Sequence, residues 1–158
     1  MPTGRRRRST PKPVPRWLAA ALVSVVAGAC VPTARTAGPY RAKAVNTAEA
    51  VHSAVASDLL VIEAVRDEHT TAPYVSVATS QAEDDASSSA STFLSMQPPD
   101  DASNDLRDEL SDVLDEAETA LADARIAARA GVNDDLLASE PKLRAVGDKL
   151  EGFQQDHQ

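Results

Sequence analysis

Apolar residues recur every three or four positions along four stretches of this chain, and this spacing constrains the fold more than any other feature. Residues at such intervals share one face of an α-helix, so each stretch predicts an amphipathic helix. The first two stripes are Ala44, Ala48, Val51, Val55, Leu59, Ile62 and Val65, then Val75, Ala78, Ala82, Ala86, Ser89, Phe93 and Met96. The other two are Leu106, Leu110, Val113, Ala117, Leu121, Ala124 and Ala128, then Leu136, Leu143, Val146, Leu150 and Phe153. The expected helices cover about residues 41–68, 73–96, 102–130 and 134–155.

Short links separate these stripes and contain residues that end or begin helices. Pro73 suits the first turn of the second helix, and the prolines at 98–99 end it. Gly131 suits the left-handed position after the third helix, and Pro141 should kink or restart the fourth, with Ser139 as a new cap. Because short connections favour antiparallel neighbours, the sequence predicts an all-α, up-down-up-down four-helix bundle.

Three further details of the helices follow from residue type. Asp101 or Ser103 can cap the third helix, and Asn133 suits the start of the fourth. Aromatic residues make up 3% of the chain, which suits closely packed helices better than sheets. Residues 80–91 are rich in Ser and Asp, which are mediocre helix formers, so we expect the second helix to be the first to fray.

The first 29 residues have the layout of an export signal. Four consecutive arginines at 5–8 belong to a basic head, and an apolar core follows at 17–28. As a helix this core would reach about 18 Å, at about 1.5 Å per residue, which is short for a hydrocarbon layer of about 30 Å. A basic run directly before an apolar core is typical of the cytoplasmic end of a signal rather than of a nucleic-acid site. The paired arginines leave twin-arginine export open beside the general route.

Cys30 is the only cysteine of the chain and follows the apolar core. Ala27 and Ala29 form an A-x-A site for ordinary signal peptidase, and residues 27–30 (AGAC) also resemble a bacterial lipobox. An exported chain with one cysteine has no internal disulfide partner, so lipidation of its thiol is the interpretation we favour. Cleavage between Ala29 and Cys30 would leave a lipidated Cys30, a tether over residues 30–39 and a helical domain over 40–158. Ordinary cleavage, and therefore secretion, is the alternative.

The domain after the signal is strongly acidic. Residues 1–29 contain six of the 16 Lys and Arg and none of the 24 Asp and Glu, so the remainder has a formal charge of −14. Nucleic acids and anionic membrane surfaces should repel such a domain. Its expected partners are the membrane, through the lipid, and an envelope protein of neutral or basic character.

Residues that could carry chemistry are few and scattered. Glu49 and His52 form one Glu-x-x-His pair, and Glu83 could join them, but a di-iron centre needs that pair twice and two more glutamates. The acidic run at 100–112 lacks the Gly and Glu of a calcium loop. No nucleotide-binding or nucleophile-elbow motif occurs in the sequence. We therefore expect no cofactor, no dedicated metal site and no enzyme activity, with Glu49, His52 and Glu83 as the weak metal candidates.

Two long segments, residues 73–100 (PYVSVATSQAEDDASSSASTFLSMQPPD) and 106–131 (LRDELSDVLDEAETALADARIAARAG), resemble small Ala- and Asp-rich lipoproteins of high-GC actinobacteria. The resemblance implies a helical bundle at the outer face of the cytoplasmic membrane and supplies no catalytic residue. The sequence thus predicts a membrane-tethered acidic helical lipoprotein that acts as an interaction or scaffolding module of the cell envelope. The alternative is a secreted or envelope bundle that binds a metal or small molecule.

Overall fold

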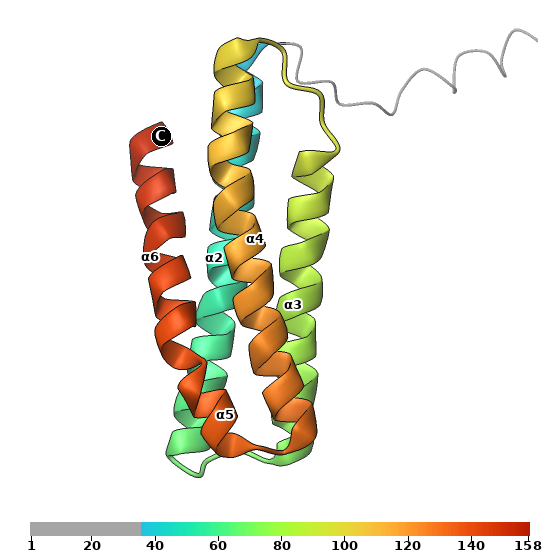
Figure 1. Ribbon diagram of the computed structural model, residues 1–158, viewed down its shortest axis with the longest axis vertical. Coiled ribbons are helices and arrows are strands. Elements are labelled where there is room, and N and C mark those ends of the chain that lie inside the picture. The colour runs from blue at the N-terminus through green and yellow to red at the C-terminus, as the bar shows by residue number, and fades with distance from the viewer. Residues whose placement is uncertain (1–35) are drawn as a thin grey trace, which may run out of the picture. The chain divides into compact units, whose positions relative to one another are not determined.

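The structure is a computed structural model, described here for residues 36–158, and it confirms the all-α class. Its helices are α2 (Ala37–Arg66), α3 (Ala72–Leu94), α4 (Asp101–Ala130), α5 (Asn133–Ala138) and α6 (Glu140–His157). Figure 1 shows the four long helices side by side as a bundle, with their short links at alternating ends and α5 at the lower end in that view. Among these described helices, none is both long and apolar enough to cross a membrane.

The helices α2 and α4 form the centre of the bundle. They contact each other, and each of them also packs against both α3 and α6. The helices α3 and α6 do not contact one another, and Figure 1 shows them on opposite sides of the α2–α4 pair. The bundle therefore has an α3 side and an α6 side, which can be compared directly.

The helix boundaries differ from the expected ones mainly at the start of α2. Residues 37–39, which the sequence assigned to a flexible tether, belong to the first turn of α2. The physical reason is Tyr40, which is fully buried and lies 5.3 Å from Phe93, measured between ring centroids. Burial of this ring holds the beginning of α2 against α3, so the helix extends outward from Tyr40.

The cap of α4 was also predicted at the wrong residue. Asp100, not Asp101 or Ser103, is the N-cap, and its side chain accepts a hydrogen bond of 2.9 Å from the Ser103 backbone N–H. Gly131 adopts the expected left-handed conformation after α4, with φ of 69°. Asn133 is the first residue of α5, as expected, and Val132 occupies the N-cap position without a side-chain cap hydrogen bond.

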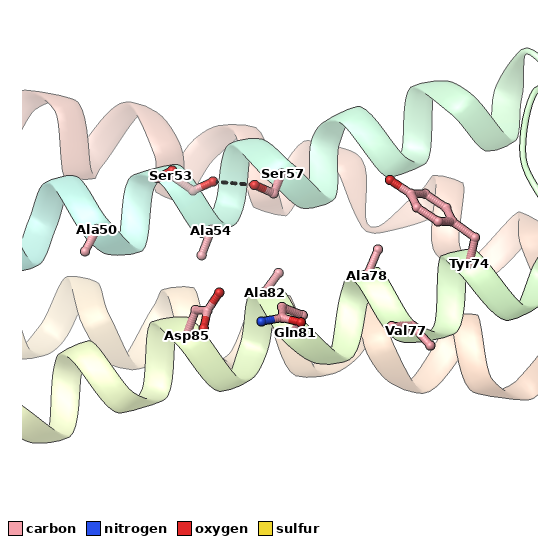
Figure 2. Close-up of a pocket in the computed structure, with 10 residues that line it drawn as sticks. All are labelled: Ala50, Ser53, Ala54, Ser57, Tyr74, Val77, Ala78, Gln81, Ala82 and Asp85. Carbon is pink, nitrogen blue, oxygen red and sulfur yellow. Dashed lines mark hydrogen bonds between the residues drawn. The ribbon is translucent and has the colours of Figure 1, made fainter.

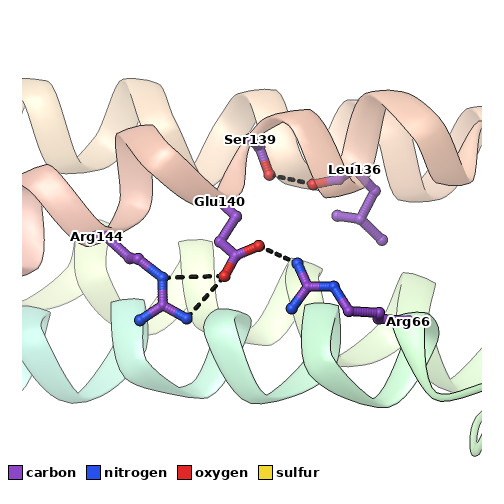
Figure 3. A network of polar contacts seen from close by, with 5 residues as sticks. All are labelled: Arg66, Leu136, Ser139, Glu140 and Arg144. Carbon is purple, nitrogen blue, oxygen red and sulfur yellow. Dashed lines mark hydrogen bonds and ion pairs between the residues drawn. The ribbon is translucent and has the colours of Figure 1, made fainter.

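The helix of the last stripe is interrupted at Ser139, which separates α5 from α6, as expected from Pro141. The Ser139 hydroxyl does not cap α6, because it donates a hydrogen bond of 2.6 Å to the Leu136 carbonyl (Figure 3). Glu140 next to it accepts hydrogen bonds from Arg144 and from Arg66 at the end of α2, which together hold the pKa of Glu140 below its usual range. This network ties the α5–α6 joint to α2.

The predicted stripes form the core, with a few exceptions at their edges. Leu59, Val65, Ala78, Ser89, Met96 and Val113 are only partly buried. The largest fully buried side chains include Tyr40, Phe93, Ile62, Leu110, Leu114, Leu121, Leu136, Leu143 and Leu150. Half of the buried residues of α3 are alanines, so this helix packs closely but buries little apolar surface per turn.

Candidate functional site

A groove of about 380 Å³ runs between α2 and α3 (Figure 2). Its lining residues are mostly small: Ala50, Ser53, Ala54 and Ser57 from α2, and Tyr74, Val77, Ala78, Gln81, Ala82 and Asp85 from α3. Alanine and serine line it because the two helices meet through short side chains, which leaves a shallow channel along their seam. Figure 2 shows the Tyr74 ring at one end of this channel and Asp85 towards the other.

The groove exposes apolar surface that the bundle does not use. Tyr74 and Val77 are 60% and 66% exposed. The hydroxyl of Ser57 is occupied within its own helix, because it donates a 2.9 Å hydrogen bond to the Ser53 carbonyl. The seam therefore offers an apolar ring and an apolar branched side chain, beside the polar side chains of Gln81 and Asp85.

The charge around the groove is entirely acidic. Within α3 there is no Lys or Arg, and α2 has none between Ala44 and Val65. Glu49 on α2 and the pair Asp84 and Asp85 on α3 are exposed, and within residues 36–158 none of the three has an ion-pair partner. Their negative charge is therefore not compensated inside the domain.

A second groove, of about 440 Å³, lies between α4 and α6 but has a different character. Ion pairs between the helices occur along this seam, from Lys142 to Asp123 at 2.8 Å and from Lys149 to Glu116 at 2.5 Å. Both lysines come from α6 and both acids from α4. Asp123 and Glu116 are thus neutralised by the chain itself, whereas Asp115, which also lines this groove, has no ion-pair partner within residues 36–158.

Asp58 is the most unusual polar residue of the described part. It lies on α2 with 0% exposure, and neither carboxylate oxygen has a hydrogen-bond partner. Burial, together with the negative charge of Glu83 on α3, raises the pKa of Asp58 to about 7. Glu83 itself is ion-paired with Arg125 of α4. Near neutral pH, then, the core between α2 and α3 holds a carboxyl group that is partly protonated.

Asp58 was not among the residues predicted from the sequence, although its helical spacing gives one signal for its burial. Asp58 lies three residues after Val55 and four before Ile62, so it occupies the buried face of α2 at helical spacing. The stripe assigned that turn to Leu59, which is only partly buried. Leu59 was preferred over Asp58 as the buried residue of that turn, because buried unpaired carboxylates are rare.

The weak metal candidates are not brought together. Glu49 is exposed on α2, His52 lies beside α6 near Gly147, and Glu83 faces α4 through its ion pair with Arg125. The described residues contain no group of three or more His, Cys, Asp or Glu that could hold a metal ion. Cys30 and the cleavage position at Ala29 lie outside the described residues.

Comparison of the chain with protein-family models, curated proteins and solved structures found no match.

Proposed function

We propose that this chain is an exported, lipid-anchored interaction module of the cell envelope, which binds a partner protein through the groove between α2 and α3. The observation that carries this proposal is the combination of an open seam with exposed Tyr74 and Val77 and with acidic residues that the domain leaves unpaired. Surface apolar groups beside charges of one sign are typical of a protein interface.

The anchor is proposed from the sequence pattern around Cys30. A basic head, an apolar core and the residues AGAC at 27–30 favour transfer of a diacylglycerol to the Cys30 thiol and attachment at the outer face of the cytoplasmic membrane. A single lipidated residue would hold the acidic domain close to envelope proteins, which raises their effective concentration at the groove.

Metabolic labelling with palmitate tests the anchor. The wild-type chain should incorporate label and fractionate with membranes, whereas Cys30→Ser should incorporate none and should stay unprocessed or appear in the medium. Release of an unlabelled wild-type chain into the medium would instead support ordinary cleavage after Ala29 and secretion.

Site-specific photo-crosslinking in cells tests the interaction. A photoreactive residue at position 77, in the groove, should give a discrete adduct with another envelope protein. The same residue at position 112, exposed on α4, is the matched control and should give none. Absence of an adduct at position 77, or equal adducts at both positions, would contradict binding through this groove.

A further inference from the structure

We infer that the groove between α2 and α3 takes an amphipathic helix that presents a small apolar face with Lys or Arg on its flanks. This inference rests on the proposed function and specifies the chemistry of the partner. It is carried by the shape of the seam, by the charges beside it and by the contrast with the α4–α6 seam.

The shape of the groove fits a short helical contact. Its floor includes Ala50 and Ala54 from α2 and Ala78 and Ala82 from α3, which allow a third helix to approach closely. From Ala50 to Ser57 the lining extends about 10 Å along α2, at about 1.5 Å per residue, which corresponds to two turns. A docked helix would therefore place side chains at i, i+3, i+4 and i+7 into the seam, against Tyr74 and Val77.

The flanking charges select for a basic helix. Asp84 lies seven residues after Val77, so it lies on the same side of α3, two turns further along. Asp85 lines the groove itself, and Glu49 lies one turn before Ser53 on α2. A helix in the seam would thus have acids beside both of its flanks, where Lys or Arg gain attraction and Asp or Glu are repelled.

The same charges disfavour a second copy of this chain as the occupant. Two α2–α3 faces brought together would both be acidic, because neither face has a Lys or Arg to compensate Glu49, Asp84 and Asp85. The α4–α6 seam differs, because Lys142 and Lys149 of α6 pair there with Asp123 and Glu116 of α4. A basic partner helix could pair its Lys or Arg side chains with the acids beside the α2–α3 groove, as the lysines of α6 pair with acids of α4.

Three designed peptides test this inference on the purified full-length chain. They share one helical apolar face of Leu and Ala and differ only on the flanks, which carry Lys, Gln or Glu. Because the contact covers only about two turns, the expected affinity of the Lys peptide is about micromolar or weaker. Fluorescence anisotropy should show the Lys peptide binding at least about tenfold more tightly than the Gln peptide, with the difference lost at high salt. The Glu peptide should not bind.

Two variants locate the binding. Val77→Asp should weaken the Lys peptide at least about tenfold, because it places a charge in the seam. The double substitution Asp84→Lys/Asp85→Lys should weaken the Lys peptide and allow the Glu peptide to bind. The control Asp112→Lys/Asp156→Lys alters net charge equally at exposed positions of α4 and α6 and should change Lys-peptide binding less than about twofold. Circular dichroism should show all variants to be helical, since every altered side chain is exposed.

Several results would overturn the inference. An equal loss in the control variant would mean that the peptide follows net charge rather than the groove. Dimers of the wild-type chain that Val77→Asp abolishes would make a second copy the occupant. A shift of Trp17 fluorescence on Val77→Asp would make the chain's own N-terminal segment the occupant, because Trp17 is the only tryptophan. An adduct at position 77 in cells with no peptide discrimination would leave the proposed function intact while refuting the basic-helix partner.

Discussion

The helices α3 and α6 flank the same central pair on opposite sides, but they are held there by different interactions. α6 buries four large apolar side chains (Leu143, Val146, Leu150 and Phe153) and exchanges ion pairs with α4 and α2. α3 buries Val75, Phe93, Thr79 and three alanines. Its Glu83 pairs with Arg125 of α4, but Asp84 and Asp85 stay outside any ion pair of the described residues. On the α6 side, two lysines of α6 pair with acids of α4, whereas on the α3 side Asp84, Asp85 and the exposed apolar surface of Val77 stay available to a partner.

Removal of Phe93 should have the largest effect, because this ring is the main large side chain that α3 contributes to the core. Phe93→Ala should lower the free energy of unfolding by about 3–5 kcal/mol, through the lost burial and the cavity left against Tyr40. Chemical denaturation measures the loss. Hydrogen exchange should show the α3 amides opening before those of α6, and protection lost equally from both helices would break the comparison.

The Asp58 carboxyl should give the next largest effect, and this effect depends on pH. Its pKa of about 7 in the folded chain lies above the ordinary value of 3.8, so the native state binds the proton more tightly than the unfolded state. The unfolding free energy should therefore fall as pH rises from about 4 to about 7 and then level off, by up to about 4 kcal/mol in total.

Asp58→Asn removes this titration and is the matched test. The variant should be more stable than wild type at pH 8 by about 2–4 kcal/mol and close to wild type at pH 4, where the wild-type carboxyl is protonated. Denaturant titrations at the two pH values measure the difference. An equal effect of the substitution at both pH values would show that the folded-state carboxyl does not titrate differently from the unfolded one.

Two glycine substitutions, one directly after α4 and one within α6, should have smaller and opposite effects. Gly131→Ala should cost about 1–2 kcal/mol, because φ of 69° strains a residue with a Cβ. Gly152→Ala, in the interior of α6 where an added Cβ meets open space, should gain about 0.5–1 kcal/mol. Thermal unfolding measures both changes. Neither should alter peptide binding at the α2–α3 groove, and a change there would couple the two sides.

The ion pairs of the α4–α6 seam should have the smallest effect. Lys149→Ala removes an exposed pair with Glu116 and should cost about 0.5 kcal/mol or less, since water and salt screen such contacts. A double-mutant cycle with Glu116→Ala isolates the pair. A coupling energy well above about 1 kcal/mol would mean that these charges, rather than the apolar residues of α6, hold that side together.

Much of the fold followed from local rules, while the site did not. The spacing of Val51 and Val55, the glycine at 131 and the proline at 141 each identified an element or its end without knowledge of the neighbours. The groove could not be predicted in this way, because its lining combines alanines and serines of two helices whose relative rotation no local rule specifies. Asp58 was missed for the same reason. Asp58 and Leu59 are neighbours on α2, and only the rotation of α2 against the other helices decides which of the two faces the core.

The sequence by itself determined the helical class, the approximate limits of the helices and the acidity of the domain, because helical periodicity and charge are properties of the chain alone. It also carries the export and lipidation pattern around Cys30, which remains a prediction. Only the tertiary structure decided which acids are neutralised and which are not. Ion pairing depends on which helices are neighbours. Because α3 and α6 pack on opposite sides of the bundle, acids of α4 pair with lysines of α6, whereas Asp84 and Asp85 have no ion-pair partner among the described residues.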